Sequence, residues 1–303
     1  MPYRFVQSLF FGNYFYGLCT VLLSVEGSVQ QFSPLNQPGY YLGVFAATVL
    51  YYTKAYMHDT SPGANVYNER TLWYAHNKKS IYFSQIALAI ILALCMVSIL
   101  VTSSFHWQSI PVLYWFLLAI FPTVAALYYG VQLPSSRGHF NLRDTGWLKP
   151  FVIGFVWAGV VTVYPLLFRV LFKHGNYVFH TIAVFLFIKN FMFITVLCIM
   201  FDIKDYVADH NRQLKTFVVR LGLRKTIFYI LLPLCIIGLG TFLGYAFTHH
   251  FPATRIVFNT IPFILLITVA YSMQRRKGIL YYLAIIDGLM LAKAVCGILG
   301  MLV

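Results

Sequence analysis

Long apolar stretches separated by short polar segments run along the whole sequence. A helix that crosses the hydrocarbon core of a bilayer needs about 20 mostly apolar residues. The pattern predicts an all-α integral membrane protein, a bundle of nine transmembrane helices. The predicted spans are residues 8–26, 40–57, 81–103, 108–129, 150–172, 177–201, 226–247, 254–273 and 278–302.

The composition supports this prediction and excludes other classes of protein. Hydrophobic residues make up 60% of the chain and charged residues only 10%, whereas a typical soluble domain is about 25% charged. An ordinary water-soluble enzyme, a disordered protein and a nucleic-acid-binding protein are therefore excluded. The five cysteines lie apart from one another inside apolar stretches, so we expect buried apolar side chains rather than a disulfide framework or a zinc site.

Membrane topology explains the net charge of +14. With the N-terminus in the cytoplasm, the longer polar segments 58–80, 130–149 and 202–225 all face the cytoplasm and carry more than half of the Lys and Arg residues. The opposite loops carry only Lys173. Because basic residues concentrate on the cytoplasmic side of membrane proteins, we predict an N-in, C-out protein of the cell (inner) membrane. The functional site is expected on its polar cytoplasmic face.

The acidic residues contain one clear pattern. The chain has only eight Asp and Glu, and three of them, Asp202, Asp205 and Asp209, follow one another at i, i+3 and i+7 where the sixth predicted span leaves the membrane. On a helix this spacing places the carboxylates on one face, where their mutual repulsion favours a bound cation. Mg²⁺ commonly binds one or two carboxylates together with substrate phosphates. The alternative is a cytoplasmic loop with solvated mixed charges.

Basic residues follow the aspartates directly, beginning with Arg212 and Lys215. A diphosphate requires this combination, with a metal ion on some of its oxygens and cationic hydrogen-bond donors on others. Lys189 and Asp287 lie inside apolar stretches, and ionisable residues at membrane depth indicate a functional role. Lys189 is therefore a further candidate to bind the diphosphate, unless its side chain extends to the interface.

The segment 202–222 resembles the second aspartate-rich motif of the UbiA superfamily of intramembrane prenyltransferases. It reads D-x-x-D-x-x-x-D, followed by Lys215-Thr216 and by a short run that ends in Leu221-Gly222. Nine spans, an internal N-terminus and a polar cytoplasmic face also match that family. By this resemblance, residues 1–303 form a single UbiA-like transmembrane domain.

The resemblance implies the transfer of an isoprenoid from a prenyl diphosphate to an aromatic or other lipid-soluble, hydrophobic acceptor. It implies Mg²⁺ as the cofactor, held by two aspartate-rich motifs after the second and sixth spans. Asp202, Asp205 and Asp209 would then be catalytic residues that bind the metal, and Lys215 would contact the diphosphate.

The first motif of the family, N-D-x-x-D-x-x-x-D, is degenerate in this chain. Residues 51–59 read Tyr-Tyr-Thr-Lys-Ala-Tyr-Met-His-Asp, so that only Asp59 keeps an acidic metal ligand. Lys54 is expected to neutralise the diphosphate directly in place of a metal ion. The chain therefore resembles a divergent member of the superfamily.

Tyr51, Tyr52 and Ala55 occupy the other key positions of this motif, and Tyr56 lies beside them. Loss of diphosphate from a prenyl substrate leaves a carbocation, which is stabilised by aromatic faces and by exclusion of water. Tyr51, Tyr52 and Tyr56 are therefore candidates to contact the prenyl group, with simple packing or lipid contact as the alternative for each.

The sequence has two alternative interpretations. A non-catalytic member of the same fold would bind an isoprenoid or another lipid without converting it. A transporter is less compatible with the sequence, because we find no repeated half and no pair of interrupted spans at corresponding positions.

Overall fold

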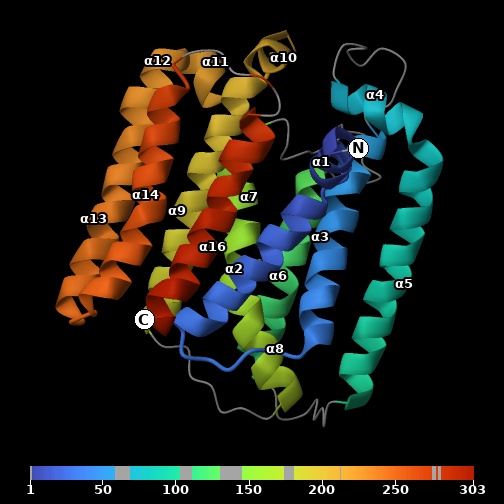
Figure 1. Ribbon diagram of the computed structural model, residues 1–303, viewed down its shortest axis with the longest axis vertical. Helices are drawn as coiled ribbons and strands as arrows, with labels where there is room; N and C mark the ends of the chain where they lie inside the picture. The colour runs from blue at the N-terminus through green and yellow to red at the C-terminus, as the bar shows by residue number, and fades with distance from the viewer. Residues whose placement is uncertain are drawn as a thin grey trace.

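Helices account for all regular secondary structure in the residues that the computed structural model describes, which are 2–58, 69–102, 111–129, 145–173, 181–211, 213–274, 278 and 281–303. The long helices lie side by side in a bundle (Figure 1). The prediction of an all-α protein is therefore confirmed.

A helix lies at each of the predicted spans, and three of the longer helices contain a π-helical turn, labelled η. In chain order the elements are α1 (Pro2–Phe11), α2 (Tyr14–Gln30), α3 (Pro38–His58), α4 (Glu69–His76), α5 (Lys78–Thr102), α6 (Val112–Tyr129), α7 (Lys149–Ala158), η3 (Gly159–Val163), α8 (Tyr164–Lys173), α9 (Thr181–Lys204), α10 (Tyr206–Asn211), α11 (Phe217–Leu221), α12 (Leu223–Thr226), η4 (Ile227–Leu231), α13 (Leu232–Thr248), α14 (Ala253–Ser272), η5 (Tyr282–Ile286) and α16 (Asp287–Leu302).

Six of the described helices are long and apolar enough to cross a membrane, and a seventh crossing is added if the bent pair α1 and α2 forms one span. The six are α5, α9, α14 and the three that contain the turns η3, η4 and η5. α6 is a shorter apolar helix, and α3 does not meet the same criterion. The helices are therefore compatible with a multi-pass membrane protein. Of the nine predicted spans, six meet the criterion by themselves and a seventh meets it as a bent pair.

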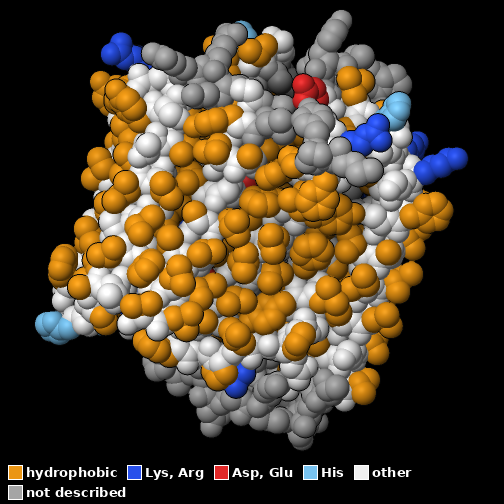
Figure 2. All heavy atoms as spheres, in the orientation of Figure 1, with side chains coloured by type: hydrophobic (Ala, Val, Ile, Leu, Met, Phe, Trp, Pro, Cys, Tyr) orange, Lys and Arg blue, Asp and Glu red, His pale blue; other side chains and the backbone are white. Residues whose placement is uncertain are grey.

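The surface of the bundle is strongly apolar. Hydrophobic side chains cover the middle of the face in Figure 2, whereas charged side chains gather mainly near its upper edge. On α5, the side chains of Phe83 and Leu94 are 69% and 63% exposed. Exposed apolar areas this extensive are rare on soluble monomers, but they suit contact with lipid chains.

The bend between α1 and α2 is fixed by polar contacts. The two helices meet at 61°, and Asn13 lies at the bend with φ of 64°, a left-handed conformation that Asn tolerates better than most residues. Its side-chain amide donates to the Thr53 and Tyr74 hydroxyls, at 3.1 Å each. Its oxygen accepts a hydrogen bond of 2.6 Å from Arg70. The start of α2 is thereby tied to α3 and α4.

Two glycines allow α2 to pack closely in the bundle. A Cβ at Gly27 would collide with the carbonyl of Val161 in η3, and a Cβ at Gly297 on α16 would collide with the Glu26 carboxylate. α2 also packs against α3, and α9 packs against α7 and α13. The side chains of α2 can therefore reach those of α16 at the centre of the bundle.

Candidate functional site

A cavity of about 620 Å³ lies inside the bundle, with walls that include residues of α2, α3, α6, α7, α9 and α16. This volume is within the range of small-molecule sites in proteins. Most of the lining is aromatic or aliphatic, and Tyr51, Tyr52 and Tyr56 all belong to it. The three tyrosines of the degenerate first-motif segment thus lie around one cavity.

Charged residues line the same cavity towards the end of the bundle that carries α4 and α10 (Figure 1). They come from five elements that are distant in sequence: α4, the first turn of α7, the end of α9 together with Asp205, α10 and the first turn of α16. The charged lining residues are Arg70, Lys149, Lys204, Asp205, Asp209 and Asp287.

The structure retains part of the predicted helical arrangement of Asp202, Asp205 and Asp209, which we call the aspartate stripe. α9 ends at Lys204 and α10 begins at Tyr206, but the Asp205 amide still donates to Phe201 O and the Asp209 amide to Asp205 O, so the helical path nearly continues. Asp205 and Asp209 line the cavity, whereas Asp202 is fully buried beside it. The stripe therefore meets the cavity through its last two members.

Lysines of the protein neutralise two of the three aspartates. The Lys149 ammonium lies 2.7 Å from Asp202 Oδ1, and Lys204 Nζ lies 3.2 Å from Asp205 Oδ1. Among the described residues, no group of three or more His, Cys, Asp or Glu side chains converges to hold a metal ion. The described residues therefore do not form a metal site by themselves. Asp59, the remaining candidate ligand, lies outside the described residues.

Arg70 belongs to the polar segment 58–80, whose basic residues the sequence assigns to the cytoplasmic face, but it is buried at the cavity wall, 3% exposed. Its guanidinium donates hydrogen bonds to Phe11 O at 3.1 Å and to the Asn13 side-chain oxygen. The guanidinium carbon, Cζ, lies 3.7 Å from the centre of the Tyr56 ring. Burial raises the pKa of the adjacent Tyr74 hydroxyl, and the positive charge of Arg70 partly opposes this rise. Tyr74 therefore stays protonated at neutral pH.

The aromatic wall is held by specific contacts. The Tyr52 and Tyr16 rings stack with centroids 4.8 Å apart, and Trp157 Nε1 donates to the Tyr52 hydroxyl at 2.6 Å. The Tyr51 hydroxyl donates to Ala125 O at 2.9 Å. The rings of α2, α3 and α7 are thereby fixed in one continuous surface.

The remaining diphosphate candidates lie elsewhere. Lys54 and Lys215 are exposed, and neither belongs to the cavity lining. Lys189 is part of a different cluster, where its ammonium donates to Asn259 Oδ1 at 2.6 Å. Arg212 lies outside the described residues.

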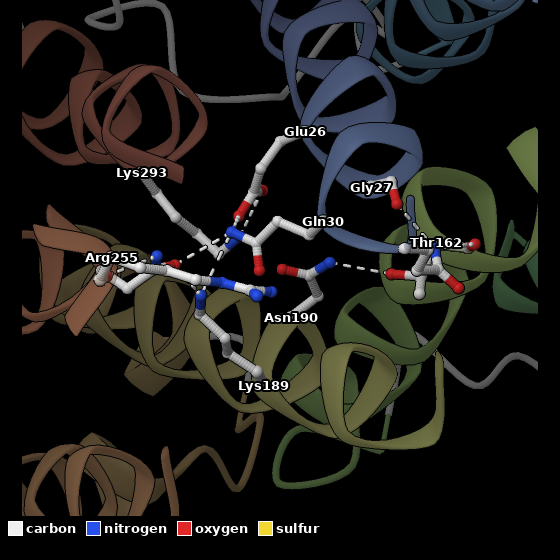
Figure 3. A network of polar contacts seen from close by, with 10 residues as sticks. Glu26, Gly27, Gln30, Thr162, Lys189, Asn190, Arg255 and Lys293 are labelled. Carbon is white, nitrogen blue, oxygen red and sulfur yellow. Dashed lines mark hydrogen bonds and ion pairs between the residues drawn. The ribbon is translucent and has the colours of Figure 1, made fainter. Parts of the chain in front are cut away.

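That other cluster is a buried polar network between α2, α9, α14 and α16 (Figure 3). Lys293 Nζ donates to Glu26 Oε2 at 2.6 Å, and Gln30 Nε2 donates to Glu26 Oε1 at 2.9 Å. Lys189 Nζ lies 4.0 Å from Glu26 Oε1. We call this set, with Asn259 and Arg255, the Glu26 cluster. Lys293 lies inside the last apolar stretch of the sequence, but no local spacing relates it to Glu26.

In comparisons with known proteins, no family model, no curated protein and no solved structure matches this chain. The proposal that follows is supported by the geometry of the cavity and by the resemblance of the 202–222 segment.

Proposed function

We propose that the protein is a UbiA-type intramembrane prenyltransferase, which transfers an isoprenoid from a prenyl diphosphate to a lipid-soluble acceptor. The observation that carries this proposal is the division of the cavity lining. Six Lys, Arg and Asp side chains lie towards one end, and aromatic and aliphatic side chains form most of the rest. A prenyl diphosphate is divided in the same way, into an anionic head and a long apolar chain.

We propose further that all nine predicted spans cross the membrane, with the N-terminus inside and the C-terminus outside. The two termini lie at opposite ends of the bundle (Figure 1), as an odd number of crossings requires. α10 and α11, which belong to the basic segment 202–225, lie at the same end as α4 and the N-terminus. Since basic segments stay in the cytoplasm, this arrangement supports a cytoplasmic position for the charged end of the cavity.

In this proposal the diphosphate binds beside Arg70, Lys149 and Lys204, the three cationic side chains of the lining. Lys149 and Lys204 are each held in place by an aspartate. Asp205 and Asp209 face the same space and would hold Mg²⁺ only together with the substrate, as one or two carboxylates plus phosphate oxygens. The metal ion would supply positive charge to the departing diphosphate.

The proposed reaction breaks the C–O bond between the isoprenoid and the diphosphate, and the diphosphate leaves with the bonding electrons. The acceptor attacks the resulting allylic carbocation and then loses a proton. Cationic side chains stabilise the leaving group, while the faces of Tyr16, Tyr52 and Trp157 stabilise the carbocation. Exclusion of water from the aromatic and aliphatic part of the cavity would also prevent capture of the carbocation by water.

The test uses the purified protein in lipid nanodiscs with geranylgeranyl diphosphate, Mg²⁺ and a total membrane lipid extract as the source of acceptor. We expect release of inorganic diphosphate and a prenylated lipid detected by mass spectrometry. An Asp205→Asn/Asp209→Asn double variant should lose this turnover while remaining inserted in the membrane. Glu69→Gln removes a carboxylate from an exposed position on α4 outside the cavity lining, and it should retain activity.

The same experiment separates the second candidate function. A non-catalytic isoprenoid-binding protein of the same fold would bind geranylgeranyl diphosphate without releasing diphosphate or forming a product. Full turnover by the double variant would contradict the proposed role of the aspartates.

A further inference from the structure

The Glu26 cluster carries more positive than negative charge. It contains three cationic side chains and one carboxylate, which are Lys189, Lys293, Arg255 and Glu26 (Figure 3). Among the described residues, no other carboxylate forms an ion pair with these cations. Lys293 and Arg255 also act on Lys189 electrostatically, so the cations are close enough to repel one another. Charge inside an apolar bundle is costly unless it is paired, and the cluster therefore favours an additional anion.

Arg255 is a buried cation whose Nε donates no hydrogen bond to a described residue. The residue is 6% exposed, and Glu26 pairs with the two lysines instead. The guanidinium carbon lies 3.8 Å from the centre of the Phe251 ring and 5.4 Å from that of the Phe32 ring. Aromatic faces attract the positive charge, but they do not replace the oxygen acceptors that guanidinium N–H groups bind. An anion in the plane of the guanidinium would supply such acceptors.

The position of Arg255 on its helix also favours an anion. It lies in the first turn of α14, which begins at Ala253, and the N-terminal end of a helix carries partial positive charge. Among the described residues, no side chain caps this end, and the first turn contains no acidic residue. Because helical side chains lean towards the N-terminus, the guanidinium lies over Phe251, two residues before the helix. Arg255 and the end of α14 thus direct positive charge to the same place.

The depth of this place favours a phosphate group as the anion. α14 begins at the end of the bundle opposite to α4 and α10 (Figure 1), and Phe32, beside Arg255, is 71% exposed. The guanidinium therefore lies just below the surface, where the end of a spanning helix meets the lipid headgroups. Phosphate is the common anion at that level. The planar guanidinium matches its oxygens with two parallel hydrogen bonds, and an ammonium such as that of Lys189 binds it as a point charge.

We propose that Arg255 and Lys189 bind a phosphate group at this end of the bundle. The site is distinct from the proposed diphosphate site and does not depend on prenyl transfer. Either a lipid headgroup or free inorganic phosphate can supply the group. Within the cluster, the Glu26–Lys293 pair joins the helices, while Arg255 and Lys189 contact the ligand.

Native mass spectrometry of the full-length protein in detergent tests the site with three probes and without prenyl diphosphate. The probes are dioleoylphosphatidylglycerol, inorganic phosphate, and dioleoylglycerol, which has the same chains as the first but no phosphate. The wild type should bind a phosphate probe about 10- to 100-fold more tightly than dioleoylglycerol, as expected for hydrogen bonds between charged groups. Preference for phosphatidylglycerol would assign the site to a lipid headgroup, and equal or tighter binding of inorganic phosphate would assign it to the free anion.

Two variants locate the site. Arg255→Gln and Lys189→Gln should each weaken binding of the preferred phosphate probe about 10-fold or more. Arg169→Gln is the matched control, because Arg169 lies on α8 at the same end of the bundle and its guanidinium donates to Leu35 O at 3.4 Å. It should bind the probe as the wild type does. The probe should also raise the unfolding midpoint of the wild type and of Arg169→Gln, but not that of Arg255→Gln, since a ligand stabilises only the state that binds it.

Two results would overturn the proposal. The first is a wild type that binds neither phosphate probe more tightly than dioleoylglycerol, as expected if a lysine of the cluster is uncharged and no anion is needed. The second is binding to Arg255→Gln and Lys189→Gln that equals binding to Arg169→Gln. If Arg255→Gln does not fold, Lys189→Gln decides in the same way, because glutamine keeps an N–H donor for Asn259, the residue that Lys189 contacts.

Discussion

The Glu26 cluster and the charged end of the cavity both place ionisable side chains inside an apolar bundle, but they differ in how those groups are paired. Glu26 is fully buried and both of its oxygens are hydrogen-bonded. At the cavity, only one oxygen of Asp202 accepts a hydrogen bond of ordinary geometry from a described residue. The two regions are therefore alike in burial but differ in how completely their carboxylates are hydrogen-bonded.

The Glu26 cluster and the cavity also differ in how closely the helices around them approach one another. The Glu26 cluster joins α2, α9, α14 and α16 where a glycine on α16 lets the helices approach closely. The cavity is lined by residues of α2, α3 and α7, among others, and charged groups lie along its wall. We infer that the Glu26–Lys293 pair contributes mainly to stability and the cavity mainly to diphosphate binding.

The largest expected effect comes from breaking the Glu26 cluster. Glu26→Ala leaves Lys293 buried without its carboxylate partner, and loss of one member of a buried ion pair typically costs about 3–5 kcal/mol of folding free energy. We expect a large decrease in the unfolding midpoint in detergent, measured by circular dichroism. Replacing both partners, as Glu26→Leu with Lys293→Met, should recover part of the loss, since paired apolar replacements are better tolerated. A Glu26→Ala protein as stable as the wild type would remove the distinction between the two regions.

Gly297→Ala tests the same cluster through packing rather than charge. The added Cβ would collide with the Glu26 carboxylate and the Gln30 side-chain amide. Overpacking of a filled core typically costs about 1–3 kcal/mol, so the unfolding midpoint should fall. Gly288→Ala is the matched control, because a Cβ at Gly288 on the same helix meets no atom within 4 Å. Equal stability of the two variants would show that the close approach at Gly297 is not required.

A smaller effect on stability, with a clear effect on binding, is expected at the cavity. Lys149→Met removes the partner of Asp202, and since the Lys149 side chain is 21% exposed, water screens part of the loss and we expect about 1–2 kcal/mol. Binding of geranylgeranyl diphosphate should weaken at the same time, as measured by isothermal titration calorimetry. For Glu26→Ala protein that remains folded, binding should stay close to that of the wild type. Equal effects of both variants on binding would contradict the division of tasks.

Much of the fold could be predicted from the sequence, because apolar stretches of suitable length define helices without reference to their neighbours. The motif resemblance also predicts that the tyrosines of residues 51–56 lie near Asp205 and Asp209. In the structure, these tyrosines and both aspartates line one cavity. Their roles in binding remain predictions.

Other features depended on which helices are neighbours, and the sequence does not contain that information directly. Glu26 and Lys293 are separated by 267 positions, so their pairing could not be found from local spacing. Arg70 and Lys149 lie in segments that also carry topology charges, and nothing in the pattern separated them from exposed lysines such as Lys54. Asp287 did give a signal, as an acidic residue within an apolar span, but its place in the cavity required the structure.

Photo-crosslinking can show whether a prenyl diphosphate occupies the cavity. A farnesyl diphosphate analogue with a benzophenone at the end of its chain is irradiated with the protein in nanodiscs, and the labelled peptides are identified by mass spectrometry. We expect labels on α3 and α7, which carry Tyr51, Tyr52 and Trp157, and we expect excess geranylgeranyl diphosphate to protect both helices. Labelling of α13, which contributes no described residue to the cavity lining, or labelling that excess geranylgeranyl diphosphate does not reduce, would contradict this expectation.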